Sequence, residues 1–272
     1  MKTFTAILVL ILALATARAE HEGKIQILLL GDSTTDAKIP RRLAPNEPQL
    51  EDLIRTLLAA EGDLPSVNVI NSGLSGEYIR RLLDSGRYDK EAAKLPGLDY
   101  ILVRYGLNDH DSREAFEFNF QKDYRELLTR LRSDHPQATV ILVTVIPFLD
   151  EPTSFQINCL IRQVADEEKL TFFDIYSRYA AELRRGPDML NYRRLPVAQI
   201  PEKLRAFAKP YVMGGKDPTV VVLDNRLDAH FGNIPDWFAD RHPNLAGYHV
   251  IADETVKLLA PLIRAQSGKA KK

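Results

Sequence analysis

Cysteine is almost missing from this sequence, and so is an excess of charge of either sign. The 272 residues include one cysteine, Cys159, so no internal disulfide can form, and a domain of this size does not need one. Cys159 lies in the apolar stretch 157–161, where a buried structural thiol is expected. Lysine and arginine total 36 against 37 acidic residues, so no overall field draws the chain to nucleic acid, which is not an expected partner.

Long apolar runs are also scarce, and the one near the N-terminus is short. Lys2 precedes the apolar run 6–15, and Ala17-Arg18-Ala19 then forms a small-x-small pattern typical of a signal-peptidase site. A membrane-spanning helix needs roughly 20 apolar residues, so an N-terminal anchor is the weaker alternative. We expect residues 1–19 to be a signal peptide cleaved after Ala19. The mature chain is then secreted or periplasmic, with no stable membrane insertion.

Five short, almost continuously apolar runs are typical of strands buried on both faces of a sheet. They are residues 25–30, 67–71, 100–105, 139–146 and 170–175. Between them, apolar residues repeat at helical spacing around 50–58, 116–131 and 157–164. This alternation predicts an α/β protein with three α/β/α layers and a central, mainly parallel, five-stranded sheet. Function is then expected at the carboxyl ends of the strands.

Residues 184–237 break this rhythm. The segment holds six prolines and a single apolar run, Val220 to Leu223. We interpret it as a proline-rich insertion or lid-like excursion within one domain of residues 20–272, and not as a separate domain. A final helix is predicted after it, with Tyr248, Ile251 and Leu259 on its apolar side.

Four polar motifs lie at the ends of predicted elements. Three of them follow the first three strands and one precedes the final helix: Gly31-Asp32-Ser33-Thr34, Asn71-Ser72-Gly73, Gly106-Leu107-Asn108-Asp109 and Asp240-Arg241-His242-Pro243-Asn244. A serine hydroxyl is a poor nucleophile unless a base removes its proton during attack, and a neutral imidazole does this near pH 7. Asp32 is expected to fix its turn by accepting backbone N–H bonds.

In this order, the four motifs resemble the four signature blocks of the SGNH (GDSL-type) hydrolases, and the resemblance implies their flavodoxin-like fold. It spans residue 25 to the final helix, apart from the insertion. It implies that Ser33 is the nucleophile and His242 its general base. It also implies an oxyanion hole made of the Ser33 N–H, the Gly73 N–H and the Asn108 side-chain amide.

The carboxylate that would orient the imidazole departs from the family pattern. Most members place an aspartate three residues before the histidine, but Ala239 stands there in this sequence. We assign the role to Asp240, two residues before His242, with Asp236 in reserve. If neither carboxylate reaches the imidazole, a Ser-His dyad acts at a lower rate.

The expected activity is that of a secreted serine esterase acting through an acyl-serine intermediate, with a small-molecule or glycan ester as substrate. Short acyl esters, such as O-acetyl groups on carbohydrate, fit an exported enzyme best. The alternatives are a lysophospholipase or thioesterase-like lipid esterase, an acyltransferase, or a carbohydrate-binding module whose catalysis has lapsed. No organic cofactor is expected.

A few further residues invite functional interpretations. His110 and Asp111 follow Asn108, but no metal-spaced ligands accompany them, so a solvated loop is expected and no metal site is predicted. Trp237, Tyr192 and Tyr211 would suit stacking on sugar rings, although packing is the default expectation for such residues.

Overall fold

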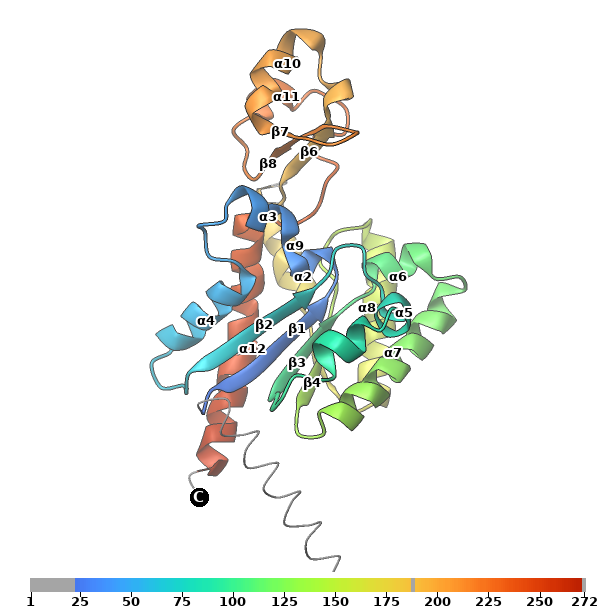
Figure 1. Cartoon of the computed structure of the whole chain (residues 1–272), viewed down its shortest axis with the longest axis vertical. Helices are drawn as coiled ribbons and strands as arrows, with labels where there is room; N and C mark the ends of the chain where they lie inside the picture. Colours follow the sequence, from blue (N-terminus) through green and yellow to red (C-terminus); the bar gives the residue numbers. More distant parts are fainter. Residues whose placement is uncertain (1–22, 187–188, 271–272) are drawn as a thin grey trace, which may run out of the picture.

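The computed structural model describes residues 23–186 and 189–270, so the predicted signal peptide lies outside the described residues. A five-stranded, wholly parallel sheet in the order β2-β1-β3-β4-β5 forms the centre (Figure 1). Its strands are β1 (Ile25–Gly31), β2 (Val67–Gly73), β3 (Tyr100–Arg104), β4 (Thr139–Val143) and β5 (Thr171–Phe173). All five predicted strands are confirmed. β4 is shorter than predicted because the Val145 N–H bonds the Asn158 side chain instead of a strand.

Helices cover both faces of the sheet, as the sequence predicted. One face carries α4 (Leu50–Ala60), α9 (Tyr176–Arg185) and α12 (Leu245–Ala270), and the other carries α5 (Ile79–Asp84), α7 (Phe116–Asp134) and α8 (Glu151–Glu167) (Figure 1). Along β1, Ile27 and Leu29 join the first layer of apolar side chains and Leu28 and Leu30 join the second. A strand covered on both faces is therefore apolar at every position.

The expectation of a buried Cys159 is wrong. Ile157, Ile161 and Val164 form the buried face of α8, while Cys159 is exposed. Two residues along a helix correspond to a turn of about 200°, which places Cys159 away from the Ile157 face. The apolar neighbours in sequence therefore do not surround this thiol in space.

Shorter elements connect the main ones. They are α2 (Ser33–Asp36), α3 (Lys38–Leu43), the π-helical turn η1 (Tyr88–Ala92) and α6 (Leu107–Ser112). Both α2 and α6 begin directly after the carboxyl ends of sheet strands, β1 and β3. The positive ends of their backbone dipoles therefore lie at one edge of the sheet.

The segment predicted as an insertion folds around a small sheet of its own. β6 (Arg193–Pro196), β8 (Thr219–Val222) and β7 (Val212–Met213) pair antiparallel in that order. The remaining elements are η2 (Val197–Gln199), α10 (Glu202–Ala208), η3 (Lys209–Tyr211) and α11 (Asp228–Phe231). Figure 1 shows this insert standing at the end of the molecule beyond α3 and α9.

Trp237 occupies the apolar cluster inside the insert. Its side chain is fully buried beside Phe231, and its indole N–H donates to Asp228, which also accepts from Arg193. Burial rules out the sugar-stacking interpretation of Trp237.

In the described part of the chain, no helix has both the length and the apolar character needed to cross a bilayer.

Candidate active site

Ser33 is the first residue of α2, directly beyond the end of β1. Asp32 caps this helix: its carboxylate accepts from the Thr34 N–H and the Thr34 hydroxyl, each at 2.8 Å. The prediction that Asp32 fixes the turn is confirmed. Burial raises the pKa of the Asp32 carboxyl, against the opposing influence of Arg104. Because Asp32 holds the cap, the Ser33 side chain is left facing the pocket.

Arg104 holds the turn at Ser33 through hydrogen bonds, a role that the sequence analysis did not predict. Its buried guanidinium donates to the Thr34 carbonyl and to the Thr35 hydroxyl. Burial lowers the pKa of Arg104, and nearby Asp32 acts in the opposite direction. The signal was present in the sequence, since an arginine interrupts the apolar run 100–105. A buried charge there requires partners, and the serine turn supplies them.

His242 lies beside Ser33 although 209 positions separate them in the chain. The imidazole Nε2 is 3.0 Å from Ser33 Oγ, and Nδ1 is 2.7 Å from Asp240 Oδ1. The same carboxylate oxygen accepts the His242 backbone N–H at 2.9 Å. The structure therefore brings together the predicted Ser33, His242 and Asp240, whereas the reserve residue Asp236 is exposed.

Asp240 contacts Arg194 as well as the imidazole of His242. Its side chain is only 4% exposed, and its second oxygen lies 2.6 Å from Nε of Arg194, a residue of the insert. Burial alone would raise the pKa of the Asp240 carboxyl. The hydrogen bonds from His242 and the charges of His242 and Arg194 outweigh burial, so the pKa lies below its ordinary value. The carboxylate thus stays ionised next to the imidazole.

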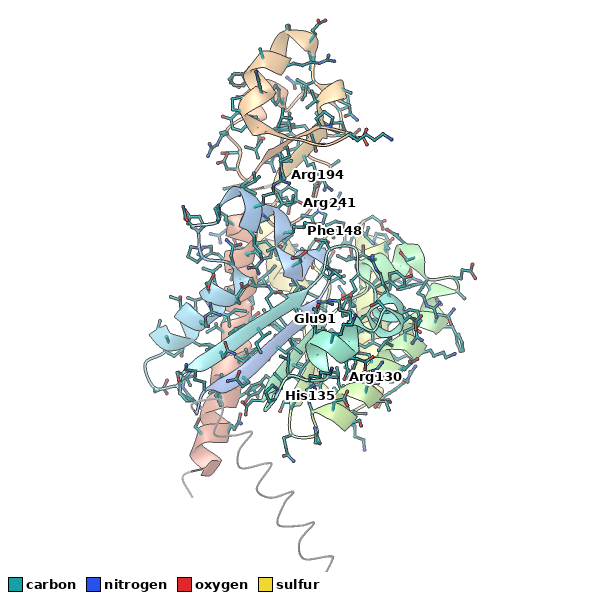
Figure 2. The ribbon with its side chains drawn as sticks, in the orientation of Figure 1. Glu91, Arg130, His135, Phe148, Arg194 and Arg241 are labelled. Atoms are coloured by element: carbon teal, nitrogen blue, oxygen red, sulfur yellow. The ribbon has the colours of Figure 1, made fainter. Side chains whose placement is uncertain are left out.

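Two aromatic rings pack against the imidazole. Tyr192 stacks on His242 with centroids 5.5 Å apart and an interplanar angle of 10°, and Phe148 meets it edge-on at 4.6 Å. Tyr192 is itself buried, and its N–H donates to the His242 carbonyl, so it packs on the histidine rather than forming an open stacking surface. In Figure 2, Phe148, Arg194 and Arg241 lie together beneath the insert.

The insert and the histidine loop are paired through their backbones. Asn191 forms an antiparallel bridge with Pro243, and the Asn244 N–H donates to the Leu190 carbonyl. The Asn244 side chain caps α12, accepting from the Gly247 N–H, and also donates to the Met189 carbonyl. The position of His242 therefore depends on the first residues of the insert.

A pocket of about 410 Å³ opens over Ser33, Asn108 and His242. Gly73 does not line it, which corrects the expectation for this glycine. The Gly73 N–H already donates to the Asn71 side chain, and a Cβ on Gly73 would lie 2.3 Å from the backbone nitrogen of Asp36. Gly73 is a glycine because α2 packs directly on the end of β2.

Gly76, three residues further on, does line the pocket and has a φ of +76°. Within residues 23–186 and 189–270, no acceptor engages the backbone N–H of Gly76 or of Ser33. The only sequence signal for Gly76 was that Ser75-Gly76 repeats the Ser-Gly pair of the predicted motif. Choosing between the two pairs required knowing which one faces the pocket.

Asn108 is fixed by the same loop. Its Nδ2 donates to the Glu77 carbonyl at 2.9 Å, which leaves the second amide hydrogen available on the pocket side. The Glu77 carboxylate is fully buried, where it accepts from the Tyr105 hydroxyl and pairs with Arg87. Burial raises the pKa of Glu77. This buried network holds the Gly76 loop and Asn108 in one fixed relation.

His110 and Asp111 lie on α6 at the protein surface. His110 Nδ1 is 3.0 Å from the Asp111 carboxylate, and both side chains are partly or largely exposed. Among the described residues, no group of histidine, cysteine, aspartate and glutamate side chains is arranged to hold a metal ion. Neither residue lines the pocket.

Gly73→Ala tests whether this glycine serves packing. The added methyl group must displace backbone atoms of α2, and overpacking of this kind costs about 1–3 kcal/mol or more. We expect a melting temperature lower by several degrees, measured by calorimetry. Gly214→Ala is the matched control, because nothing lies near a Cβ built there. Equal melting temperatures for the two variants would contradict the packing role.

Asp109 predicts a pH dependence of stability. It is fully buried, one of its oxygens accepts from the Ile79 N–H at 2.9 Å, and burial raises its pKa to about 7. The unfolded chain releases this proton near pH 4, so stability falls as the pH rises from about 4 to 7 and levels off above that. Asparagine does not titrate. The melting temperature of Asp109→Asn relative to wild type should therefore climb across this window.

Thermal unfolding at pH 4.5, 6 and 8 measures the difference in melting temperature between Asp109→Asn and wild type. Each kcal/mol of stability corresponds to a shift of ~2–4 °C. Asp111→Asn provides the control, because its carboxylate is 68% exposed and should show no such trend. A difference between Asp109→Asn and wild type that is constant with pH would show that Asp109 does not titrate abnormally.

Comparison with known proteins supports this reading of the fold. The model of the GDSL-like lipase/acylhydrolase family matches residues 29–196, more than half of the chain. No curated protein matches the sequence.

Among solved structures, LAE5, an alpha/beta hydrolase from the Lake Arreo metagenome, is 20% identical over 86% of this chain and 94% of its own, with a TM-score of 0.53. A lipase/acylhydrolase from Enterococcus faecalis is 19% identical over 87% and 96%, with a TM-score of 0.52. Axe2, an acetylxylan esterase from Geobacillus stearothermophilus, is 17% identical over 86% and 93%, also with a TM-score of 0.52. These likenesses show the fold, and the matched family model, which spans the first three of the four motifs, confirms the predicted family. The chain belongs to the GDSL-like lipase/acylhydrolase family.

Proposed function

We propose that this protein is an exported serine esterase that removes short acyl groups, such as O-acetyl groups on carbohydrate, through an acyl-Ser33 intermediate. The observation that carries the proposal is the continuous contact from Ser33 Oγ to His242 Nε2 and from His242 Nδ1 to Asp240. A hydroxyl, an imidazole and an ionised carboxylate in that order are what nucleophilic acyl transfer requires.

In the first half-reaction, Ser33 Oγ attacks the ester carbonyl while His242 Nε2 accepts the hydroxyl proton. Asp240 holds the imidazole with Nε2 directed at the serine and stabilises the positive charge that forms on the ring. The imidazolium then donates its proton to the departing alcohol, which leaves the acyl group on Ser33. In the second half-reaction, His242 deprotonates a water that attacks the acyl-enzyme, and the imidazolium then returns this proton to Ser33 Oγ as the carboxylic acid leaves.

The negative charge of each tetrahedral intermediate requires fixed donors. We assign the oxyanion hole to the Ser33 N–H, the Gly76 N–H and the Asn108 amide, so that Gly76 replaces Gly73 in the sequence-based assignment. Two of these donors have no acceptor in the described protein, and the third is held by Glu77. Donors that need no reorganisation typically contribute ~3 kcal/mol each to transition-state stabilisation.

Two further observations favour this substrate class. The pocket volume of about 410 Å³ suits a small acyl group joined to one or two sugar rings. The N-terminal sequence favours export, where polysaccharide esters are accessible. Asp240 lies 2.7 Å from the imidazole despite its shifted place in the sequence, which removes the main argument for a lapsed catalytic site.

Hydrolysis of p-nitrophenyl acetate by Ser33→Ala tests the proposal. Without the hydroxyl no acyl-enzyme can form, so we expect kcat to fall by on the order of 10⁴-fold or more. Ser66→Ala, at an exposed position away from the pocket, should keep wild-type activity. If wild type and Ser33→Ala hydrolyse the ester equally slowly, the esterase proposal fails.

Asp240→Asn and Asp236→Asn separate the two candidate carboxylates. An amide at position 240 cannot stabilise the imidazolium and favours the wrong tautomer of His242, so kcat should drop by roughly 10²–10⁴-fold. Asp236 has a φ of +65°, which asparagine tolerates, so Asp236→Asn should fold and remain active. Steady-state kinetics of both variants decide the assignment, and a comparable loss in the two would contradict it.

A further inference from the structure

The charges on the wall of the catalytic pocket are of one sign. Lys38 and Arg194 both line it, and no carboxylate is found among the described residues that do. The whole chain has a formal net charge of −1, so this local excess of positive charge does not reflect the composition of the protein. Positive charge gathered in a concave, partly dehydrated site acts more strongly on a ligand than the same charge on an open surface.

Arg194 reaches the pocket because of its place in β6. The strand alternates between buried and exposed positions, so that Arg193 packs inward against Asp228 while Arg194 faces outward. Nε of Arg194 contacts Asp240, but the side chain is still 44% exposed. Within the described residues, no protein acceptor engages the two terminal nitrogens of its guanidinium. Arg194 can therefore bind Asp240 and an anionic ligand at once, since a guanidinium carries five N–H donors.

Lys38 is the second cation on the pocket wall. It is the first residue of α3, is exposed, and forms no ion pair with an acidic residue of the described chain. A positive charge in the first turn of a helix is disfavoured by the helix dipole, so Lys38 does not stabilise α3. Its ammonium group remains available to a molecule in the pocket.

The mechanism indicates which part of the substrate meets these cations. His242 must stand next to the alcohol oxygen in order to protonate it, so groups packed around His242 flank the alcohol and not the acyl group. Arg194 belongs to this group, because it contacts Asp240, which in turn contacts the imidazole. We propose that the alcohol portion of the substrate carries an oxyanion group, a carboxylate or a sulfate, which Arg194 and Lys38 bind. This inference rests on the proposed esterase function and names its substrate class: acylated acidic saccharides.

The test compares three acetylated methyl glycosides with the acetyl group on the same hydroxyl: a glucoside, a glucuronoside and a sulfated glucoside. Charge-assisted hydrogen bonds should raise kcat/KM for at least one anionic substrate by ~10-fold or more over the neutral one. The anion that is preferred identifies the group. Added NaCl should reduce the preference, because exposed charges are screened.

Lys38→Gln and Arg194→Gln should each lower the ratio of anionic to neutral kcat/KM towards one. The ratio is taken within each variant, so a general loss of activity, which Arg194→Gln can cause through Asp240, cancels. Lys122→Gln, at an exposed position of α7 away from the pocket, is the matched control and should keep the wild-type ratio.

Two results would overturn the inference while leaving the esterase proposal in place. One is Ser33-dependent hydrolysis of p-nitrophenyl acetate with no preference for either anionic saccharide. The other is a preference that both Lys38→Gln and Arg194→Gln retain in full. Failure of the proposed function itself would look different, because no substrate would then be hydrolysed in a Ser33-dependent way.

Discussion

The parallel register of β2, β1 and β3 fixes where the pocket forms. Gly31 at the end of β1 lies opposite Gly73 of β2 on one side and Arg104 of β3 on the other. The chain leaves all three strands at the same level, so the serine turn, the Gly76 loop and the Asn108 turn emerge side by side. Only the imidazole has to be brought to this edge from elsewhere, and the last loop before α12 does so.

Close packing at this edge leaves little freedom to the proposed catalytic groups. α2 presses on Gly73, Arg104 holds the Thr34 carbonyl from below, and buried Glu77 links the second and third turns. The first two contacts constrain backbone, and the third also fixes the Asn108 side chain. Pre-organised donors are effective in catalysis because they need not reorganise when charge develops.

Strand periodicity was enough to predict the α/β/α fold and to place Ser33 and Asn108 at one edge, because the carboxyl ends of parallel strands must share an edge. His242 and Asp240 follow no strand, so their pairing with Ser33 was expected from the resemblance to the SGNH hydrolases and not from periodicity. The same reasoning failed where the answer depends on contacts between segments. Gly73 and Gly76 are indistinguishable as residue types until α2 is seen to cover one of them. Arg104 looks like an interruption of a strand until the serine turn is placed next to it. The small sheet within residues 193–222 was not predicted, because its prolines are typical of irregular segments.

The backbone pairing between the insert and the histidine loop has a consequence for how this enzyme can change. A lid hinged on a flexible linker can be exchanged or deleted without disturbing the base beneath it. Here residues 191–194, which lead into and begin β6, supply the ring stacked on His242, the cation on Asp240 and the bridge to Pro243. With the proposed roles of His242 and Arg194, substrate selectivity and proton transfer both depend on this four-residue stretch, so neither can be altered there without affecting the other.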